Sequence, residues 1–502
     1  MTNTLKGEPV LVVGAGIMGV GIAQVAAQAG HTVMLFDTRD GAAAEGKNKL
    51  ATTLEGLVAK GKLGADDAMQ TLLRIVAVGT LEGAASARLV VEAIVENLAI
   101  KRGLFQQLEA IVAPDCVLAT NTSSISVTAI ANGLQHPGRL VGMHFFNPVP
   151  LMKLVEVVSG LQTDATVSAT IFDLAKTWGK VAVHARSTPG FIVNRIARPY
   201  YAETLALLLE QAATPAVLDA CLRSAGFRMG PCELMDLIGH DTNLAVTQSV
   251  YEANFFDKRF VPSLVQREMV DGGLLGRKSG RGFYDYTDGV TPAVPESTES
   301  IPLPTARLLR VHGTGRVAQG LATALEKTGQ AFLNVPASDW LGLEVDGAQL
   351  RMTDGRTASQ LGADVAVFDL PVSVGNGAAL AWAPSLRASP AWSGTAARWL
   401  AALGFKPQRV TDVPGLVVAR TLAMLINEAA DAVQQGVCTS EGANQAMKLG
   451  VNYPAGPFDW LAAWSAQGVI DVLEALDAEY RGERYRVSPW LRQQACAALG
   501  SA

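Results

Sequence analysis

Several kinds of sequence feature are scarce or missing in this chain of 502 residues. Although 49% of the residues are hydrophobic, no uninterrupted apolar run reaches the length of about 18 residues that a membrane-spanning helix needs. The first residues also lack the charged segment, the apolar segment and the cleavage site of a signal peptide. We therefore expect a soluble, cytoplasmic protein that contacts no membrane.

Cysteine and long runs of charge are equally scarce. The five cysteines are widely spaced and form no CxxC motif, which indicates free thiols in a reducing compartment and predicts no metal site. The 41 basic and 46 acidic residues give a net charge of −5 without any long basic block, which argues against a nucleic-acid partner. We expect a small molecule as the ligand.

The first part of the chain alternates between short apolar runs and helical patterns. The runs typical of strands cover residues 9–13, 32–36, 75–78, 89–93, 116–119 and 140–143. Such alternation is typical of a doubly wound parallel sheet in an α/β fold, so residues 1–187 are predicted to form a Rossmann-type domain. A chain of this length exceeds one hydrophobic core, and further domains are expected.

The next part has a purely helical character. Residues 191–211 are predicted to form one long helix, and further helical patterns continue to about residue 267. We therefore expect an all-helical domain over residues 188–286. Residues 287–304 are rich in proline, serine and threonine, which favours a linker over residues 287–305.

The remainder repeats the first part in a reduced form. Residues 308–315 resemble the opening strand and glycine turn, with Ala318 in place of the third glycine, and residues 404–420 parallel residues 179–195. Residues 449–458 likewise match residues 225–232. These matches predict an internal duplication, with a shortened, degenerate Rossmann-like region at 306–410 and a second helical domain at 411–502.

A glycine motif follows the first predicted strand. Gly14, Gly16 and Gly19 form the pattern GxGxxG between a strand and a helix, and Asp37 ends the next strand. This context favours dinucleotide binding over a simple tight turn, because the glycines let a pyrophosphate approach the positive helix terminus. A carboxylate at Asp37 favours NAD over NADP, although Arg39 nearby weakens that preference.

Two polar residues are predicted at the carboxyl edge of the sheet, where ligands bind in such folds. His144 follows a strand, and strand alternation places Glu156 on the same face as Leu154 and Val158. A carboxylate buried among apolar side chains needs a partner, and an imidazole held by one can take a proton from an alcohol. The alternatives are a core histidine and a surface salt bridge from Glu156 to Lys153 or Lys101.

These motifs resemble the L-3-hydroxyacyl-CoA dehydrogenase family over residues 8–286. The segments that carry the resemblance are 121–124 (NTSS), 144–148 (HFFNP), 154–157 (LVEV), 189–195 (PGFIVNR) and 278–284 (KSGRGFY). The resemblance implies reversible, NAD-dependent oxidation of a 3-hydroxyacyl-CoA to a 3-oxoacyl-CoA. It also implies that the substrate lies in a cleft between the first two domains.

The resemblance also assigns roles to individual residues. By it, His144 is the general base, Glu156 orients it, and Ser123 and Asn194 hydrogen-bond the acyl-CoA substrate. Glu96 and Lys101 match positions at which the family contacts the nicotinamide half of NAD. Lys60 and Thr53 match positions at which it contacts CoA. For Lys60, a solvated helix charge remains the alternative.

The second half is expected to be inactive. Ala419 stands at the position of Asn194, and the shortened region is expected to have no counterpart of the segments around Ser123, His144 and Glu156. This layout resembles long bacterial members assigned to 3-hydroxyadipyl-CoA or 3-hydroxybutyryl-CoA, including those of phenylacetate breakdown and fatty-acid metabolism. The resemblance further implies that the second helical domain docks on the first in place of a partner subunit, with a homodimer still open.

Two other functions remain open from the sequence. A 6-phosphogluconate-like 3-hydroxyacid dehydrogenase shares the plan of a Rossmann domain followed by helices, but it acts on a free acid and commonly uses a catalytic lysine. A non-catalytic NAD-binding protein is the second alternative. The motifs around His144 and Glu156 disfavour both.

Overall fold

The computed structural model describes residues 5–287, 303–374 and 377–499. The chain divides into two compact units. The first unit consists of Met1–Arg195 and Ala432–Val451, and the second consists of Ile196–Asp431 and Asn452–Ala502. A segment of the second helical domain therefore belongs to the same compact unit as the first Rossmann-type domain.

The first unit is built on an eight-stranded sheet with the strand order β3-β2-β1-β4-β5-β6-β7-β8. Its strands are β1 (Val10–Val13), β2 (Val33–Phe36), β3 (Ile75–Ala77), β4 (Leu89–Glu92), β5 (Val117–Thr120), β6 (Leu140–Phe145), β7 (Leu154–Ser159) and β8 (Val181–Arg186). Most of them are completely buried, because an α/β sheet is covered by helices on both faces. The Rossmann-type architecture predicted from the alternating pattern is confirmed.

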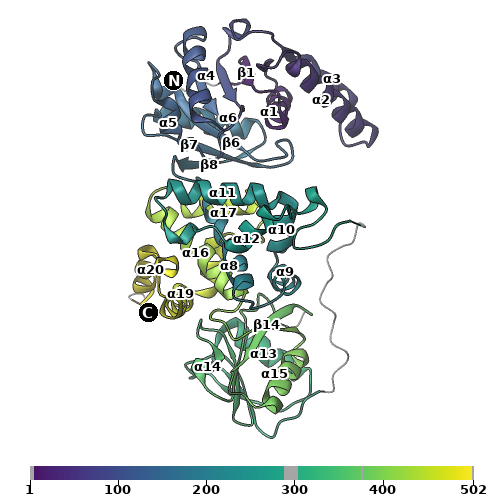
Figure 1. The fold of residues 1–502 in the computed structure, drawn as a ribbon, viewed down its shortest axis with the longest axis vertical. Coiled ribbons are helices and arrows are strands. Elements are labelled where there is room, and N and C mark those ends of the chain that lie inside the picture. The colour runs from purple at the N-terminus through teal and green to yellow at the C-terminus, as the bar shows by residue number, and fades with distance from the viewer. Residues whose placement is uncertain (1–4, 288–302, 375–376, 500–502) are drawn as a thin grey trace. The chain divides into compact units, whose positions relative to one another are not determined.

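The helices of the first unit flank this sheet or, as α2 and α3 do in Figure 1, extend to one side of it. They are α1 (Ile17–Gln28), α2 (Ala42–Ala59), α3 (Ala65–Arg74), α4 (Leu98–Ile111), α5 (Val127–Ala131), α6 (Ala165–Thr177), α7 (Val193–Ile196, which ends in the second unit) and α17 (Ser440–Gly450). Helix α17 packs on β7 and β8. It is the part of the second helical domain that joins this unit.

One strand pair departs from the parallel sheet that the sequence predicts. Strands β6 and β7 are antiparallel, and His144 pairs with Glu156 in their register. The connection between them is only residues 146–153, which is too short for the crossover that parallel neighbours require. This reversal brings the two candidate catalytic side chains opposite each other.

The second unit contains the first helical domain. Its helices are α8 (Arg198–Leu209), α9 (Pro215–Ser224), α10 (Pro231–Ile238), α11 (His240–Ala253) and α12 (Leu264–Asp271). The prediction of one continuous helix over residues 191–211 is wrong, because the chain forms the short α7 and then α8, with Pro199 in its first turn. Proline removes a backbone donor and cannot sit inside a helix without disrupting it. The repeated segment, which lacks this proline, forms the single helix α16 (Val418–Gln434).

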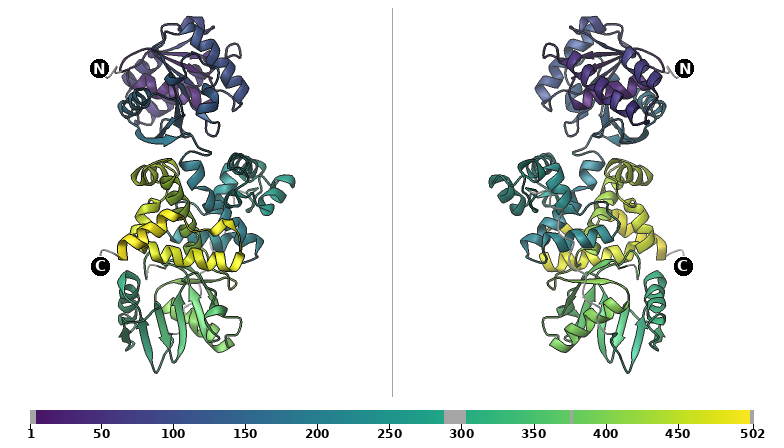
Figure 2. Two further views of the ribbon diagram at one scale, coloured as in Figure 1. Left: turned by 90° about the vertical axis from the view of Figure 1, so that its left-hand side faces the viewer. Right: turned by 90° about the vertical axis from the view of Figure 1, so that its right-hand side faces the viewer.

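A smaller sheet follows in the second unit, green in both views of Figure 2. Its strand order is β10-β9-β11-β12-β13-β14-β15. The strands are β9 (Leu309–His312), β10 (Leu333–Val335), β11 (Gly342–Val345), β12 (Ala348–Met352), β13 (Val365–Phe368), β14 (Ala379–Pro384) and β15 (Lys406–Arg409). The predicted linker lies mostly outside the described residues.

The remaining helices of the second unit flank this sheet or complete the second helical domain. They are α13 (Gly315–Glu326), α14 (Ala358–Leu361), α15 (Pro390–Ala402), α16, α18 (Pro457–Trp464), α19 (Ala466–Tyr480) and α20 (Pro489–Leu499). Antiparallel pairs join β9 to β11, β11 to β12 and β13 to β14, so this sheet is more mixed than the first.

Candidate active site

The candidate catalytic pair lies on neighbouring strands of the first sheet. His144 is on β6 and Glu156 is directly opposite on β7. Nδ1 of His144 lies 2.5 Å from Oε2 of Glu156, and the two side chains are 7% and 0% exposed. Because the carboxylate occupies Nδ1, the other ring nitrogen, Nε2, is directed to a different partner.

The second oxygen of Glu156 binds the backbone. Oε1 accepts hydrogen bonds from the amides of Ile192 and Val193, at 3.1 and 3.0 Å. These amides point inward because the chain turns at Gly190 and Phe191, which both have positive φ, +76° and +47°. The carboxylate therefore has a fixed orientation, set by the turn that leads into α7.

Aromatic rings surround the imidazole of His144. The ring of Phe146 lies 4.5 Å from it and that of Phe191 lies 5.8 Å from it, centroid to centroid. The end of β6 is fixed by Asn121, whose Oδ1 accepts the amide of Phe145 at 2.8 Å. Phe146, Phe191 and Asn121 belong to the sequence motifs, but no individual role was predicted for them.

Ser123 lies on a loop that is organised by Glu96. A carboxylate oxygen of Glu96 accepts hydrogen bonds from Oγ1 of Thr122 at 2.6 Å and from the amides of Ser123 and Ser124 at 2.9 and 3.1 Å. Burial alone raises the pKa of Glu96, but these hydrogen bonds and the charge of Lys101 outweigh it and hold the pKa below its usual value. An ionised Glu96 therefore fixes the shape of the loop.

A buried ionic network, which sequence reasoning missed, extends this support. Lys101, with a side chain only 1% exposed, binds Glu92 at 2.6 Å and Glu96 at 3.2 Å. Thr120 donates to the other oxygen of Glu92 at 2.7 Å. The signal in the sequence was a carboxylate ending the apolar strand 89–92. Since Lys101 pairs here, the alternative in which it binds Glu156 is wrong.

The other substrate residues differ in their placement. Nδ2 of Asn194 lies 3.4 Å from the backbone oxygen of Ser123, so these two positions are brought together. Lys60 and Thr53 lie exposed on or at the end of α2, and Oγ1 of Thr53 donates to the carbonyl of Lys49 in the same helix. Among the described residues, no contact connects Lys60 or Thr53 to the loop of Ser123.

The glycine turn and Asp37 form the candidate dinucleotide site. A Cβ at Gly14 would lie 2.4 Å from the carbonyl oxygen of Ala93, and one at Gly19 would lie 1.8 Å from that of Gly14, so both positions require glycine. At Gly16 nothing lies within 4 Å, which leaves open space in front of α1. Oδ2 of Asp37 accepts the amide of Ala15 at 2.7 Å. This bare turn fits a pyrophosphate, and the carboxylate fits a ribose.

The second sheet contains strands equivalent to β6 and β7, which corrects the expectation that these segments have no counterpart. Strands β13 and β14 are antiparallel, and β14 pairs with β15, as β7 pairs with β8. The repeat that relates residues 404–420 to 179–195 aligns Gln408 with Val183. Their strand partners, Ala381 and Glu156, are therefore equivalent positions.

The residue opposite Ala381 is Asp369, whose amide donates to the carbonyl of Ala381 at 2.9 Å. Asp369 thus holds the position of His144. Its carboxylate accepts hydrogen bonds from the amides of Val417 and Val418, at 2.9 and 2.7 Å, as Glu156 does from Ile192 and Val193. The degenerate half therefore keeps a carboxylate that binds the amides of the turn, but it lacks an imidazole at this position.

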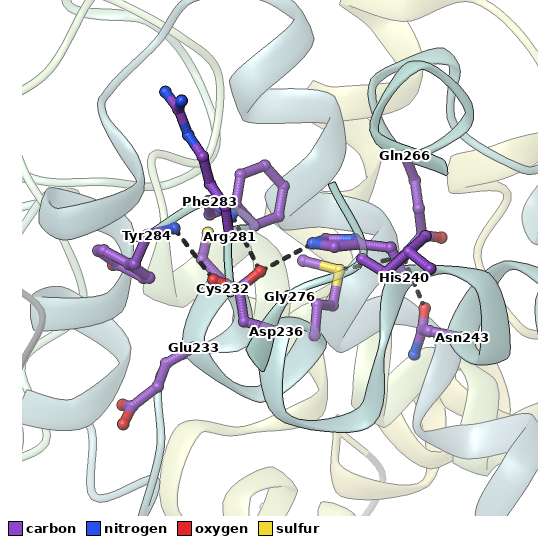
Figure 3. A network of polar contacts seen from close by, with 12 residues as sticks. Cys232, Glu233, Asp236, His240, Asn243, Gln266, Gly276, Arg281, Phe283 and Tyr284 are labelled. Carbon is purple, nitrogen blue, oxygen red and sulfur yellow. Dashed lines mark hydrogen bonds and ion pairs between the residues drawn. The ribbon is translucent and has the colours of Figure 1, made fainter. Parts of the chain in front are cut away.

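The last of the sequence motifs, residues 278–284, has a structural role in the second unit (Figure 3). The buried carboxylate of Asp236 accepts the amides of Phe283 and Tyr284, at 2.9 and 3.0 Å, and it binds Nε2 of His240 at 2.9 Å. A Cβ at Gly282 would lie 1.9 Å from Oδ1 of Asp236. The glycine of this motif is therefore required for close packing.

Two general features of the described ranges bear on function. No helix there is both long and apolar enough to cross a membrane. Within the same residues, no group of three or more histidine, cysteine, aspartate or glutamate side chains is placed to hold a metal ion.

Comparison with known proteins matches nearly the whole chain. Residues 9–188 match the pattern of the 3-hydroxyacyl-CoA dehydrogenase NAD binding domain, and residues 190–286 and 415–499 match that of the 3-hydroxyacyl-CoA dehydrogenase C-terminal domain. Residues 350–414 match the 3-hydroxybutyryl-CoA dehydrogenase reduced Rossmann-fold domain. The two halves thus carry the same helical domain after Rossmann domains of different size.

Individual relatives agree with these domains. The chain is 42% identical to the 3-hydroxyadipyl-CoA dehydrogenase of Escherichia coli K12, over 98% of each protein. The crystal structure of a 3-hydroxybutyryl-CoA dehydrogenase from Escherichia coli K12 matches with a TM-score of 0.89, at 41% identity and over 99% of each chain. A probable 3-hydroxybutyryl-CoA dehydrogenase of Deinococcus radiodurans is 44% identical, over 55% of this chain and 99% of that protein.

The chain shares 42% identity with a full-length relative, and family domains match between residues 9 and 499. This agreement shows membership of the family and not only a shared fold. The chain belongs to the 3-hydroxyacyl-CoA dehydrogenase family of NAD-dependent oxidoreductases.

Proposed function

We propose that His144 is the general base for oxidation of the 3-hydroxyl group of an L-3-hydroxyacyl-CoA. The observation that carries this proposal is the 2.5 Å contact between Nδ1 of His144 and Oε2 of Glu156 in a buried strand pair. With Nδ1 bound, Nε2 accepts the proton of the substrate hydroxyl as the ketone forms. In the reverse direction the imidazolium returns that proton.

Glu156 stabilises the imidazolium that this step creates. Its negative charge lies next to Nδ1, and the amides of Ile192 and Val193 hold its other oxygen. A carboxylate fixed in this way sets the tautomer of His144 and needs no reorganisation during the reaction. The proton therefore stays on the histidine and is not passed to the glutamate.

Ser123 and Asn194 are the proposed substrate contacts. Their proximity supports this role, since Nδ2 of Asn194 lies 3.4 Å from the carbonyl of Ser123. The ionised Glu96 holds the amide of Ser123 at 2.9 Å and keeps the loop in one shape. Side chains held by such supports can orient the hydroxyl and the thioester without rearrangement.

The proposed NAD site uses the glycine turn for the pyrophosphate and Asp37 for the adenosine ribose. When bound there, NAD supplies the acceptor for the hydrogen removed from C3. Glu96 and Lys101 are proposed to lie near its nicotinamide half, because Glu96 already adjoins the loop of Ser123. A carboxylate at Asp37 disfavours the 2′-phosphate of NADP.

The substrate is proposed to be 3-hydroxyadipyl-CoA or 3-hydroxybutyryl-CoA, with Lys60 and Thr53 contacting CoA. The names printed for the full-length sequence match and the full-length structural match from Escherichia coli support these two acyl groups. We place the reaction in the cytoplasm, in phenylacetate or fatty-acid catabolism. A panel of acyl-CoA substrates of both kinds, at matched concentrations, decides between a terminal carboxylate and a terminal methyl group.

The second helical domain is proposed to replace a partner subunit. In the second unit Arg259 binds Glu428 at 3.0 Å, and Arg484 binds Glu203 at 2.7 Å. Arg259 and Arg484 are each the middle residue of a three-residue turn, Lys258–Phe260 and Glu483–Tyr485, in the two copies. Contacts across a two-fold interface occur in such reciprocal pairs. A homodimer of full-length chains through another surface stays compatible with this arrangement.

The experiment that tests the function is an assay of NADH consumption with acetoacetyl-CoA and the full-length protein. The proposal expects turnover with the CoA thioester and none with free 3-hydroxyacids. Turnover of the free acid alone would favour a 6-phosphogluconate-like dehydrogenase. Tight NADH binding without any turnover would favour a non-catalytic binding protein.

A further inference from the structure

The first unit contains a piece of the second helical domain, Ala432–Val451. Helix α17 of this piece packs on β7, the strand that carries Glu156, and on β8. Ahead of the helix, the carbonyl of Val437 accepts the amide of Arg186, which ends β8, at 2.9 Å. The far end of the duplicated chain thus contributes to the sheet edge that holds the catalytic pair.

The end of α17 contacts the supports of both catalytic residues. A Cβ at Gly450 would lie 2.7 Å from Cδ2 of Leu154, 3.0 Å from Cγ2 of Val193 and 3.7 Å from Cε1 of Phe146. Leu154 precedes Glu156 by two residues on the same face of β7, Val193 gives its amide to Glu156, and the ring of Phe146 packs on His144. Gly450 therefore lies against three groups that position the pair.

A second residue of this segment, Cys438, lies in the stretch that binds β8 and Arg195. Burial, together with the negative charge of Glu156, raises the pKa of the Cys438 thiol to about 12, while the charge of Arg195 acts in the opposite direction. The neighbouring side chain of Arg195 donates to Oε1 of Gln435 at 2.8 Å. Cys438 therefore directly follows residues that bind Arg186 on β8 and Arg195, and the charge of Glu156 acts on its thiol.

The other half of the molecule contains the same contact without the catalytic pair. In the second unit, Oγ of Ser224 at the end of α9 accepts the amide of Ala379, which starts β14. Ala379 is equivalent to Leu154, and α9 packs on β14 as α17 packs on β7. This half tolerates a side chain at the helix end, whereas the catalytic half has glycine there.

We propose that residues 432–451 of the second helical domain form the back wall of the active site, and that Gly450 and Cys438 are positioning residues for Glu156 and His144. This inference rests on the proposed roles of that pair. It assigns the duplicated helical domain a part in catalysis that goes beyond replacing a partner, because the geometry of β7 and of the turn at residues 190–193 depends on it.

The back wall acts by restricting movement of the carboxylate. Glu156 is hydrogen-bonded to His144 and to the turn, and Gly450 at the end of α17 lies against Leu154 on the same strand and against Val193 in the turn. A shift of about 1 Å in a positioned group is enough to cost on the order of 100-fold in rate. Small changes at residues 438 and 450 are therefore expected to alter kcat while the distant glycine turn still binds NADH.

The decisive experiment places a charge at position 438 and follows the pH dependence of kcat/KM. In Cys438→Asp the new carboxylate favours the imidazolium of His144 and raises the pKa of the base. In the plot of kcat/KM against pH for the oxidation reaction, the acid limb is then expected to shift to higher pH by about 0.5 to 1 unit. Cys438→Asn has nearly the same shape without the charge and should leave the limb in place.

The surroundings of position 438 set the size of this shift. Arg195 is close enough to pair with the new carboxylate and reduces its effect on His144. The remaining ionisable groups on β7, β8 and the segment itself are Glu156, His184, Arg186, Glu441 and Lys448. None of these changes between Cys438→Asp and Cys438→Asn, so the difference between the two variants isolates the added charge.

Two controls come from the internal repeat. Ala213→Asp places the same charge at the equivalent position of the first copy and should not move the acid limb. Gly450→Val should lower kcat by about tenfold or more with an unchanged Kd for NADH, whereas Ser224→Val should leave kcat within about twofold.

The outcomes distinguish failure of the back-wall proposal from failure of the proposed role of His144 as the base. If His144→Asn abolishes turnover while Cys438→Asp keeps the wild-type pH profile, the back wall is refuted and the proposed function stands. If His144→Asn keeps turnover, the assignment of the base fails instead. If Gly450→Val does not fold, the comparison of Cys438→Asp with Cys438→Asn still tests the back-wall proposal, because both variants add little bulk.

Discussion

Asp369 occupies in the second sheet the position that His144 occupies in the first. Both lie at the end of a strand whose antiparallel neighbour carries the equivalent residues Ala381 and Glu156. The carboxylate of Asp369 directly binds the amides that Glu156 binds in the first half. The first half thus binds the turn amides through Glu156 and keeps His144 for chemistry. The second half keeps only a carboxylate that binds the turn amides.

The first prediction concerns the proposed base. His144→Asn removes the group that accepts the proton, so kcat is expected to fall by about 100-fold or more. The Kd for NADH should stay nearly unchanged, because the glycine turn and Asp37 lie on other strands. Steady-state kinetics with acetoacetyl-CoA and a fluorescence titration of NADH measure the two quantities. Turnover near that of the wild type would identify His144 as a core histidine.

The second prediction concerns the choice of cofactor. Asp37 accepts the amide of Ala15 and presents its carboxylate at the start of α1, where a 2′-phosphate would meet it. The wild type should therefore have a much higher kcat/KM with NADH than with NADPH. Asp37→Ser removes the repulsion and should narrow this ratio, with Arg39 available to the phosphate. Equal kcat/KM values in the wild type would contradict the role of Asp37.

The sequence predicted the catalytic pair because both residues interrupt apolar strands. Glu156 lies among valines and leucine on β7, and a buried carboxylate requires a partner. The spacing could not show that β6 and β7 are antiparallel, which makes His144 and Glu156 direct neighbours. That reversal follows from the short connection between the strands, and sequence alternation alone does not distinguish it from a crossover.

Other parts of the structure depend on contacts that local sequence does not encode. The hydrogen bond from Thr120 to Glu92 joins the ends of β5 and β4 and therefore depends on the order of strands in the sheet. The hydrogen bond from the amide of Arg186 to the carbonyl of Val437 joins residues that are far apart in the sequence. The break between α7 and α8, by contrast, was readable from Pro199 and was missed because the apolar pattern continues across it.

The third prediction uses the unusual titration of Asp369. Burial raises its pKa from 3.8 to about 6, against the opposing effect of four backbone hydrogen bonds. The folded protein therefore binds this proton more tightly than the unfolded chain, so the contribution of Asp369 to stability is largest below pH 4 and is lost as the pH rises to about 6. A difference of about 2 pKa units corresponds to roughly 3 kcal/mol.

Asp369→Asn removes this titration and provides the measurement. The free energy of unfolding of the wild type minus that of the variant should decrease by roughly 3 kcal/mol between pH 4 and pH 7. Denaturant melts at both pH values test it, and kcat at a permissive temperature should be unaffected, since Asp369 lies in the second unit. A difference that does not change with pH would mean that Asp369 is ionised throughout.

The last prediction tests whether the second half replaces a partner subunit. A chain that ends after Tyr286 keeps His144, Glu156, Ser123 and Asn194 but loses α16 and α17. Several charged groups then lose their buried partners, among them Glu203, which binds Arg420 at 2.8 Å and Arg484 at 2.7 Å. Removing one side of a buried ion pair costs about 3 to 5 kcal/mol, and the apolar surface around it becomes exposed.

This fragment is therefore expected to dimerise or aggregate, which static light scattering measures directly. A self-complementary dimer would restore the reciprocal contacts between two copies of the same helical domain. The full-length chain serves as the control, because its tether keeps the second copy at an effective concentration of about millimolar. A fragment that is monomeric and as stable as the full chain would show that the second half does not replace a partner. If the fragment forms a soluble dimer with a reduced kcat, the missing contact of Gly450 with the catalytic half accounts for the lower kcat. In that case Gly450→Val in the full-length chain should lower kcat in the same way without changing the mass of the particle.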